Sequence, residues 1–121
     1  MTAVVLFAHG SRDAEWARPF RAIRDRIRAA RPELGVELAF LEVMQPTLAD
    51  ALTAFAARGE SRIYVAPLFM AQGAHLKRDL AAMLEDGRRA HPHVAIEVLP
   101  AVGEMDSVLA AISDSIAKAA A

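Results

Sequence analysis

Two histidines follow short apolar segments, at positions where α/β proteins commonly carry functional side chains. His9 comes directly after the apolar segment 3–8, and His75 comes shortly after the apolar segment 63–68. The carboxyl ends of parallel strands meet at one edge of a sheet, and ligands of open α/β folds bind beyond that edge. If both segments are strands of one sheet, the two imidazoles share a crevice. Imidazole binds metal ions and accepts protons near neutral pH, so the sequence predicts metal-ion or proton-transfer chemistry.

The first histidine belongs to a specific local motif, His9-Gly10-Ser11-Arg12. Glycine permits a tight turn and a close approach of a ligand to the backbone. We expect the hydroxyl of Ser11 to cap the following helix and the guanidinium of Arg12 to bind a carboxylate or phosphate. A simple strand-to-helix turn is the alternative, but core packing does not explain an imidazole at the carboxyl end of a strand.

The second histidine follows an apolar loop, residues 67–74, that contains Phe69, Met70 and Gly73. This composition fits a site where a flat apolar ligand meets a metal ion. A buried loop anchored by Phe69 and Met70 explains it equally well. Lys77 follows on the next helix, where it is either a ligand anchor or a solvated side chain.

A carboxylate is expected beside His9. Glu42 follows the apolar segment 36–41 and stands two residues before Met44. If the first two strands are neighbours, Glu42 lies near His9. Together with His75 it then completes a metal-binding set of two histidines and one carboxylate with open coordination positions. An exposed acidic residue in front of a helix is the alternative interpretation.

A second histidine pair, His91 and His93, resembles a metal site but lies before the fourth apolar segment. That position is at the amino end of the predicted sheet, away from the crevice. We therefore expect neither histidine to take part in the chemistry.

The composition limits the classes of function. The chain has no cysteine, so histidine, carboxylate or carbonyl groups must hold any metal ion. The formal net charge is −1, which provides no global field for nucleic acid or membranes. Seven arginines lie between residues 12 and 31, but the same segment carries Asp13, Glu15 and Asp25, so we expect a solvated helix face. The first apolar segment is too short for a signal peptide or a membrane span. A cytoplasmic protein without nucleic-acid or membrane partners is predicted.

The order of the elements follows from two alternating patterns. Four short apolar runs have the composition of buried strands, and four segments repeat apolar residues every three or four positions, as helices do. This alternation predicts an α/β fold with a single three-layer domain over residues 1–121 and a four-stranded parallel sheet. We expect the strand order 2-1-3-4, a truncated flavodoxin-like topology whose switch point lies between the strands that deliver His9 and His75. The runs are Ala3–Ala8, Val36–Leu41, Ile63–Leu68 and Val94–Leu99, and the helical patterns cover Trp16–Ala30, Leu48–Ala56, Leu76–Leu84 and Met105–Ile116.

Taken together, these motifs resemble the class II tetrapyrrole chelatases, in particular the short sirohydrochlorin chelatases of cobalamin and sirohaem synthesis. The resemblance covers nearly the whole chain and depends on three blocks in the right order. They are His9-Gly10-Ser11-Arg12, then Leu41-Glu42 with Gln45-Pro46-Thr47-Leu48, then Pro67-Leu68-Phe69 with Gly73-Ala74-His75 and Asp79.

The resemblance implies an ATP-independent enzyme that inserts Co²⁺ or Fe²⁺ into sirohydrochlorin, with Ni²⁺ as a further candidate and no permanent cofactor. It implies that His9 and His75 bind the incoming metal ion and accept pyrrole protons, with Glu42 as a participant. It also implies a homodimer with the tetrapyrrole in the cleft between two lobes. Because the substrate carries many carboxylates and an apolar ring, the expected substrate-binding residues are Ser11, Arg12, Met44, Phe69, Met70, Gly73 and Lys77.

Two other functions fit parts of the sequence. A non-catalytic carrier of metal or tetrapyrrole would have the same site without turnover. A histidine-dependent phosphatase would also place His9-Gly10 after a strand, but its chemistry normally needs an arginine beside the nucleophilic histidine, where this chain has Ala8.

Overall fold

The computed structural model describes residues 1–121 and confirms the predicted α/β fold. Four strands form one parallel sheet in the order β2-β1-β3-β4, which is the order 2-1-3-4 expected from the sequence. Each strand agrees with its predicted run to within one residue at either end. The strands are β1 (Thr2–Ala8), β2 (Gly35–Phe40), β3 (Arg62–Pro67) and β4 (Ala95–Val98).

The central strand β1 organises the sheet. It pairs with β2 on one side and with β3 on the other, in parallel along almost its whole length. Its side chains alternate between two cores: Val5 and Phe7 are buried on one face, whereas Leu6 and Ala8 are buried on the other. A strand that is buried on both faces has apolar residues at nearly every position, which explains why the run before His9 lacks polar residues.

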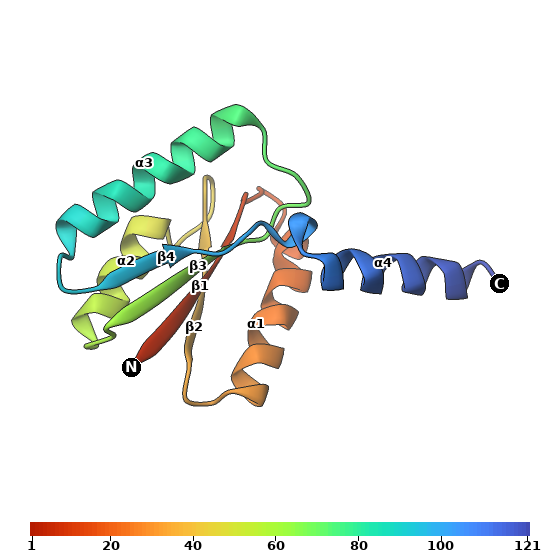
Figure 1. Cartoon of the computed structure of the whole chain (residues 1–121), viewed down its shortest axis with the longest axis horizontal. Helices are drawn as coiled ribbons and strands as arrows, with labels where there is room; N and C mark the ends of the chain where they lie inside the picture. The colour runs from red at the N-terminus through yellow and green to blue at the C-terminus, as the bar shows by residue number, and fades with distance from the viewer.

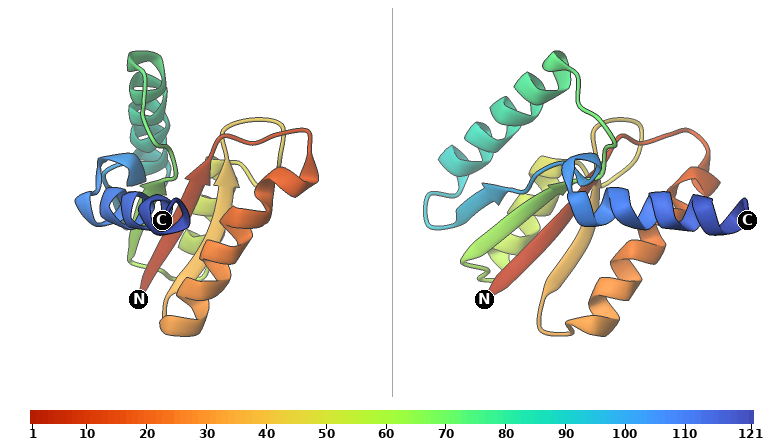
Figure 2. Two further views of the ribbon diagram at one scale, coloured as in Figure 1. Left: turned by 90° about the vertical axis from the view of Figure 1, so that its right-hand side faces the viewer. Right: turned by 45° about the vertical axis from the view of Figure 1, so that its right-hand side comes forward.

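Helices cover the two faces unequally (Figures 1 and 2). α2 and α3 pack on one face and contribute most helical residues of the larger core cluster. α1 packs alone on the opposite face. The helices are α1 (Arg18–Ala30), α2 (Leu48–Ala57), α3 (Ala74–Ala90) and α4 (Asp106–Ala119), with 3-10 helices η1 (Ala14–Ala17) before α1 and η2 (Val102–Glu104) before α4.

The first helical segment differs from the continuous helix predicted from Trp16. The chain first forms η1, and α1 then begins at Arg18 with Pro19 in its first turn. Proline has no N–H to donate and is tolerated only where a helix begins, so it marks the start of a new helix here.

The fourth helix lies where predicted in the sequence but not against the sheet. α4 projects away from the body of the molecule, and none of its residues is buried (Figure 1). Its apolar stripe includes Leu109, Ile112 and Ile116, whose side chains are 40%, 38% and 65% exposed. No helix is both long enough and apolar enough to cross a membrane.

Candidate functional site

Three loops that follow β1, β2 and β3 lie at the carboxyl edge of the sheet (Figure 1). The first loop carries His9 and the second carries Glu42. The third leads into α3, of which His75 is the second residue. The fold therefore places the predicted chemistry at one edge, as the strand order required.

The first two loops bring His9 and Glu42 into direct contact. Nε2 of the imidazole lies 2.7 Å from Oε1 of the carboxylate. Both side chains are more than half exposed, at 52% and 59%, so the pair is open to solvent and to ligands. The backbone fixes this pairing, because the N–H of Glu42 donates to the carbonyl of His9 at 3.1 Å and that of Leu41 donates to the carbonyl of Ala8 at 2.9 Å. The expected proximity of His9 and Glu42 is thus confirmed.

Gly10 allows this close approach. Its φ of +101° lies in a region that L side chains rarely adopt. A Cβ at this position would stand 1.9 Å from the backbone carbonyl oxygen of Glu42. Glycine is therefore required here for both backbone conformation and space, and it keeps the two loops in contact.

Val43 is a feature of the site that the sequence did not indicate. Its φ is +71°, and the N–H of Met44 donates to the carbonyl of Glu42 at 2.8 Å across it, which forms a tight γ-turn. A β-branched residue in this region is strained, and such strain is concentrated at functional sites. The turn follows Glu42 directly and leaves the Val43 side chain 60% exposed at the rim. A valine gives no warning of a positive φ, so no local sequence signal could have found it.

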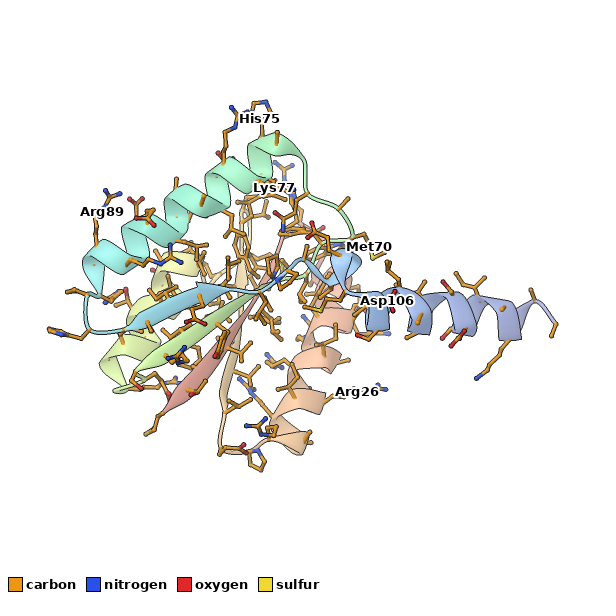
Figure 3. All side chains as sticks on the ribbon, viewed as in Figure 1. Arg26, Met70, His75, Lys77, Arg89 and Asp106 are labelled. Atoms are coloured by element: carbon orange, nitrogen blue, oxygen red, sulfur yellow. The ribbon has the colours of Figure 1, made fainter.

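His75 lies apart from the other two groups. It stands at the tip of α3, and its side chain points outward in Figure 3. Its Nδ1 accepts a hydrogen bond from the guanidinium of Arg78 at 3.3 Å. Nowhere does the chain bring three His, Asp or Glu side chains close enough to hold a metal ion. The structure thus gives a two-residue pair, and the set of His9, Glu42 and His75 stays a prediction.

Ser11 does not cap a helix, contrary to the sequence-based expectation. Its hydroxyl accepts a hydrogen bond from the N–H of Asp13 at 3.1 Å. Asp13 itself caps η1 by accepting from the N–H of Glu15 at 3.0 Å. The Ser11 oxygen is occupied by the N–H of Asp13, only two residues away, so η1 begins after Asp13 instead of after Ser11.

The apolar residues expected to bind substrate are placed differently from one another. Phe69 is half-buried and packs edge-on against Phe7, with ring centroids 5.9 Å apart. Met44 is half-buried against the core on the α1 face. Met70 is 58% exposed and lies near η2 (Figure 3). Of the three, Met70 offers the most apolar surface to a ligand.

The polar and turn residues of the prediction lie around these loops. Arg12 is exposed beside His9 and Ser11. Gly73 is the N-cap of α3 and has no side-chain partner there. Lys77 lines a groove of about 210 Å³ between α3 and the segment that leads from β4 to η2, together with Gln72 and Glu104. Positive charge is therefore available on both sides of the carboxyl edge.

The largest cavity, about 340 Å³, lies between α2 and α3, and none of the predicted site residues lines it. His91 borders this cavity and its Nε2 is 3.2 Å from the hydroxyl of Thr53. This hydrogen bond ties α2 to the end of α3, which is a structural role.

The clear pKa shifts lie outside the site. A hydrogen bond from Arg31 lowers the pKa of the exposed Glu33 carboxyl, in the turn after α1. A side-chain hydrogen bond with Tyr64, with the charge of Glu97 nearby, raises the pKa of Arg62 at the start of β3. Neither group belongs to the loops that carry His9 and Glu42 or lead to His75.

The His9–Glu42 pair has donor atoms and a spacing that suit a divalent metal ion. Imidazole and carboxylate ligands at about 2.1 Å hold their donor atoms about 3.0 to 3.4 Å apart around one ion. The observed 2.7 Å separation therefore needs to widen only slightly. Two exposed ligands leave most coordination positions free, which favours a transient site over a closed structural one.

Residues 3–119 match the model of the CbiX family. Because this match covers almost the whole sequence, the chain belongs to the CbiX family. The sequence-based resemblance to the class II chelatases is thereby confirmed.

Curated relatives have a consistent name. The chain is 39% identical to the sirohydrochlorin cobaltochelatase of Methanopyrus kandleri, in a match that covers 69% of this chain and 59% of the relative. It is also 39% identical to the protein of that name from Saccharolobus islandicus, with 69% of this chain and 64% of the relative covered. The chain spans less than two thirds of the length of these relatives.

Solved structures share the fold. A CbiX protein from Marinobacter aquaeolei, described as a cobalamin biosynthesis protein, matches with a TM-score of 0.86 and 28% identity over 98% of this chain and 96% of its own. SirB from Bacillus subtilis with Fe³⁺ matches with a TM-score of 0.77 and 25% identity over 93% of this chain and 45% of its own. The sirohydrochlorin chelatase SirB from Bacillus subtilis subspecies spizizenii, in complex with cobalt, has a TM-score of 0.80 at 24% identity and shows the same fold over 50% of its length.

Proposed function

We propose that this protein is a sirohydrochlorin chelatase that inserts Co²⁺ or Fe²⁺ into the tetrapyrrole, with Ni²⁺ as a further candidate substrate. The main observation behind this proposal is the solvent-exposed His9–Glu42 pair, which lies at the carboxyl edge of the sheet in a member of the CbiX family. The names of the curated relatives support the same substrate class. The reaction requires no permanent cofactor and no ATP, and we expect it to take place in the cytoplasm.

In this proposal His9 and Glu42 receive the metal ion from solution. The ion enters between Nε2 and Oε1, which replaces their hydrogen bond with two coordination bonds. The carboxylate contributes a negative charge that favours the divalent ion, and the neutral imidazole contributes a nitrogen ligand. Their exposure allows the ion to leave again for the macrocycle.

The same pair accepts protons from the substrate. Two pyrrole N–H groups must lose their protons as the metal binds four ring nitrogens. After the ion has left, the imidazole of His9 takes one proton, and the adjacent Glu42 carboxylate stabilises the resulting imidazolium by a charge-assisted hydrogen bond. Solvent at the open edge takes the proton away.

The surrounding loops hold the substrate. Arg12 and Lys77 bind peripheral carboxylates of the tetrapyrrole. The hydroxyl of Ser11, which accepts from the N–H of Asp13 in the free chain, donates a further hydrogen bond to the substrate. Gly73 leaves the start of α3 free of side-chain atoms. Met44, Phe69 and Met70 provide the apolar wall for the ring.

His75 serves as the third metal ligand and a second proton acceptor. Its position at the tip of α3 places it outside the pair in the free chain. Residues 70–73, which precede α3, are mostly exposed and lack core packing, so we expect this segment and the start of α3 to move on substrate binding and bring the imidazole to the ion.

The working form is a homodimer that assembles through α4. The apolar stripe of α4 is unburied, and a helix of 14 residues is about 21 Å long, enough to cross a small sheet. The face of the sheet beside α1 lacks a second helix. On that face Tyr64 is half-exposed and Glu97 is exposed, and Ile23 of α1 is 39% exposed. A second copy's α4 fits this vacant position, and two-fold symmetry makes the exchange mutual.

A charge on the stripe tests this assembly. Ile112→Asp should convert a two-chain species into single chains, because the new carboxylate would have to be buried against the partner. Ala110→Asp, on the opposite side of α4, is the matched control and should leave the assembly intact. Sedimentation velocity at micromolar concentration measures both. A wild-type protein that sediments as a single chain and still metallates its substrate would refute the homodimer.

The decisive test of the activity is an absorbance assay with sirohydrochlorin and one metal ion at a time, Co²⁺, Fe²⁺ or Ni²⁺, without ATP. Catalytic conversion to the metallated product, faster than the reaction without protein, supports the proposal. Stoichiometric binding without turnover would identify a carrier instead. The ion with the highest kcat/KM, not the tightest binding, indicates the preferred substrate, because affinity follows the Irving–Williams order regardless of function.

A further inference from the structure

Gly103 in η2 lies against the loop that leads to His75. Its N–H donates to the carbonyl of Phe69 at 3.0 Å. A Cβ on Gly103 would stand 1.7 Å from the carbonyl oxygen of Met70 and 2.4 Å from the Met70 Cα. These atoms belong to the backbone and cannot rotate away, so only glycine allows the two segments to lie this close.

The contact holds the backbone that carries the Met70 side chain. Phe69 is fixed from the core side by its edge-on contact with Phe7. From the outer side, Gly103 binds the carbonyl of Phe69 and packs on the Met70 peptide. The two constraints leave Met70 as a 58% exposed apolar side chain at the rim (Figure 3). After Met70, residues 71–73 form a mostly exposed segment that ends where α3 begins at Ala74.

We infer that Gly103 is a positioning residue for tetrapyrrole recognition, because it holds the Phe69–Met70 peptide so that Met70 can contact the macrocycle. The inference rests on the proposed function. It adds to the site a residue from the connection between β4 and α4, which contributes none of the proposed substrate-binding side chains. A side chain at position 103 displaces the peptide without touching His9 or Glu42. It therefore weakens substrate binding and leaves the metal-binding pair intact.

The test compares Gly103→Ala with Gly59→Ala. Gly59 lies in the turn between α2 and β3, where a Cβ would meet no atom within 4 Å, and unlike Gly103 it has a positive φ, of +86°. Gly59→Ala therefore adds a methyl group and local backbone strain outside the site, without the overlap that Gly103→Ala creates. Steady-state kinetics with sirohydrochlorin and Co²⁺ should show that Gly103→Ala raises KM about tenfold or more, with kcat lowered less than about threefold, while Gly59→Ala changes neither.

A second readout does not depend on activity. The chain has five methionines, so methyl-¹³C methionine spectra are simple to assign. Gly103→Ala should shift the Met70 methyl resonance and leave that of Met83, which borders the α2–α3 cavity, unchanged. If Gly103→Ala does not fold, Val102→Gly loosens η2 without adding atoms, and it should raise KM about threefold and shift the same resonance.

The outcomes separate the two proposals. A wild-type protein without chelatase activity refutes the proposed function, and the Met70 resonance then still tests whether Gly103 positions the loop. An active wild type whose KM is unchanged by Gly103→Ala overturns the inference. An unshifted Met70 resonance overturns it equally.

Discussion

The loop after β1 carries His9 and the loop after β3 leads to His75 at the start of α3, but the two loops are held in different ways. The first continues the pairing of β1 with β2 through two backbone hydrogen bonds, and the His9–Glu42 contact adds a third bond between side chains. The second is held near its start, where the N–H of Leu68 donates to the carbonyl of Phe7 and Gly103 binds Phe69. From Met70 to His75 it is mostly exposed.

This difference separates a preformed part of the site from an adaptable one. A metal-receiving pair benefits from fixed geometry, because ligands held in place lose little freedom on binding. A loop that must admit and release a large planar ring benefits from mobility. Under the proposed function, metal capture falls to His9 and Glu42, and closure on the substrate falls to the segment that leads to His75.

The largest expected effect comes from removing either histidine. His9→Ala and His75→Ala should each lower metal insertion by at least about 10²-fold, because each removes a metal ligand and a proton acceptor. The comparison predicts a further distinction. His9→Ala should also weaken Co²⁺ binding in the absence of tetrapyrrole, whereas His75→Ala should not. Metal titrations followed by calorimetry measure this difference.

The matched control for these variants is His93→Ala. His93 is exposed and makes no hydrogen bond, and it lies at the opposite end of the sheet. Its loss should leave insertion and metal binding unchanged. If all three variants lose activity equally, the division of roles between the two loops is wrong.

A smaller effect is expected from adding a side chain at Gly10, in the loop after β1. Gly10→Ala places a Cβ 1.9 Å from the Glu42 carbonyl oxygen in a left-handed backbone. It should lower the free energy of unfolding by about 2 to 4 kcal/mol and separate His9 from Glu42. Gly59→Ala has the strain without the overlap and should cost about 1 to 2 kcal/mol with normal activity. Thermal denaturation and the insertion assay provide both numbers, and equal losses in the two variants would show that the loops are not in close contact.

The smallest effect concerns pH. Protonated imidazole neither binds a metal ion nor accepts a proton, and histidine in general titrates near neutral pH. Lowering the pH from about 8 to about 5.5 should therefore reduce insertion by about tenfold, with circular dichroism used to confirm that the protein stays folded. A profile that is flat over this range would remove the proton-accepting role of histidine and leave the metal-binding role to be judged by titration.

Much of this architecture was predictable because it depends on short-range patterns. Apolar runs such as the one before His9 alternate with segments in which apolar residues recur at helical spacing. Few folds other than a parallel α/β sheet accommodate this alternation. The proximity of His9 and Glu42 followed from the strand order, because neighbouring parallel strands must end beside each other. The helix cap expected at Ser11 was wrong, because Asp13, two residues later, caps η1, and α1 begins only at Arg18 with Pro19 in its first turn.

Other features became visible only in three dimensions. The residue type of Val43 gives no sign of its positive φ, and the contact between Gly103 and Met70 joins segments that are far apart in the sequence. The apolar stripe of α4 predicted a helix with a buried face, but whether that face packs on the same chain or on another depends on the path of the chain after η2. The sequence by itself thus determined the sheet, its order and the His9–Glu42 edge, since these follow from local periodicity and strand adjacency. Only the tertiary structure decided which histidine is held in place, which glycine admits a neighbouring backbone and which helix remains uncovered, since long-range packing governs all three.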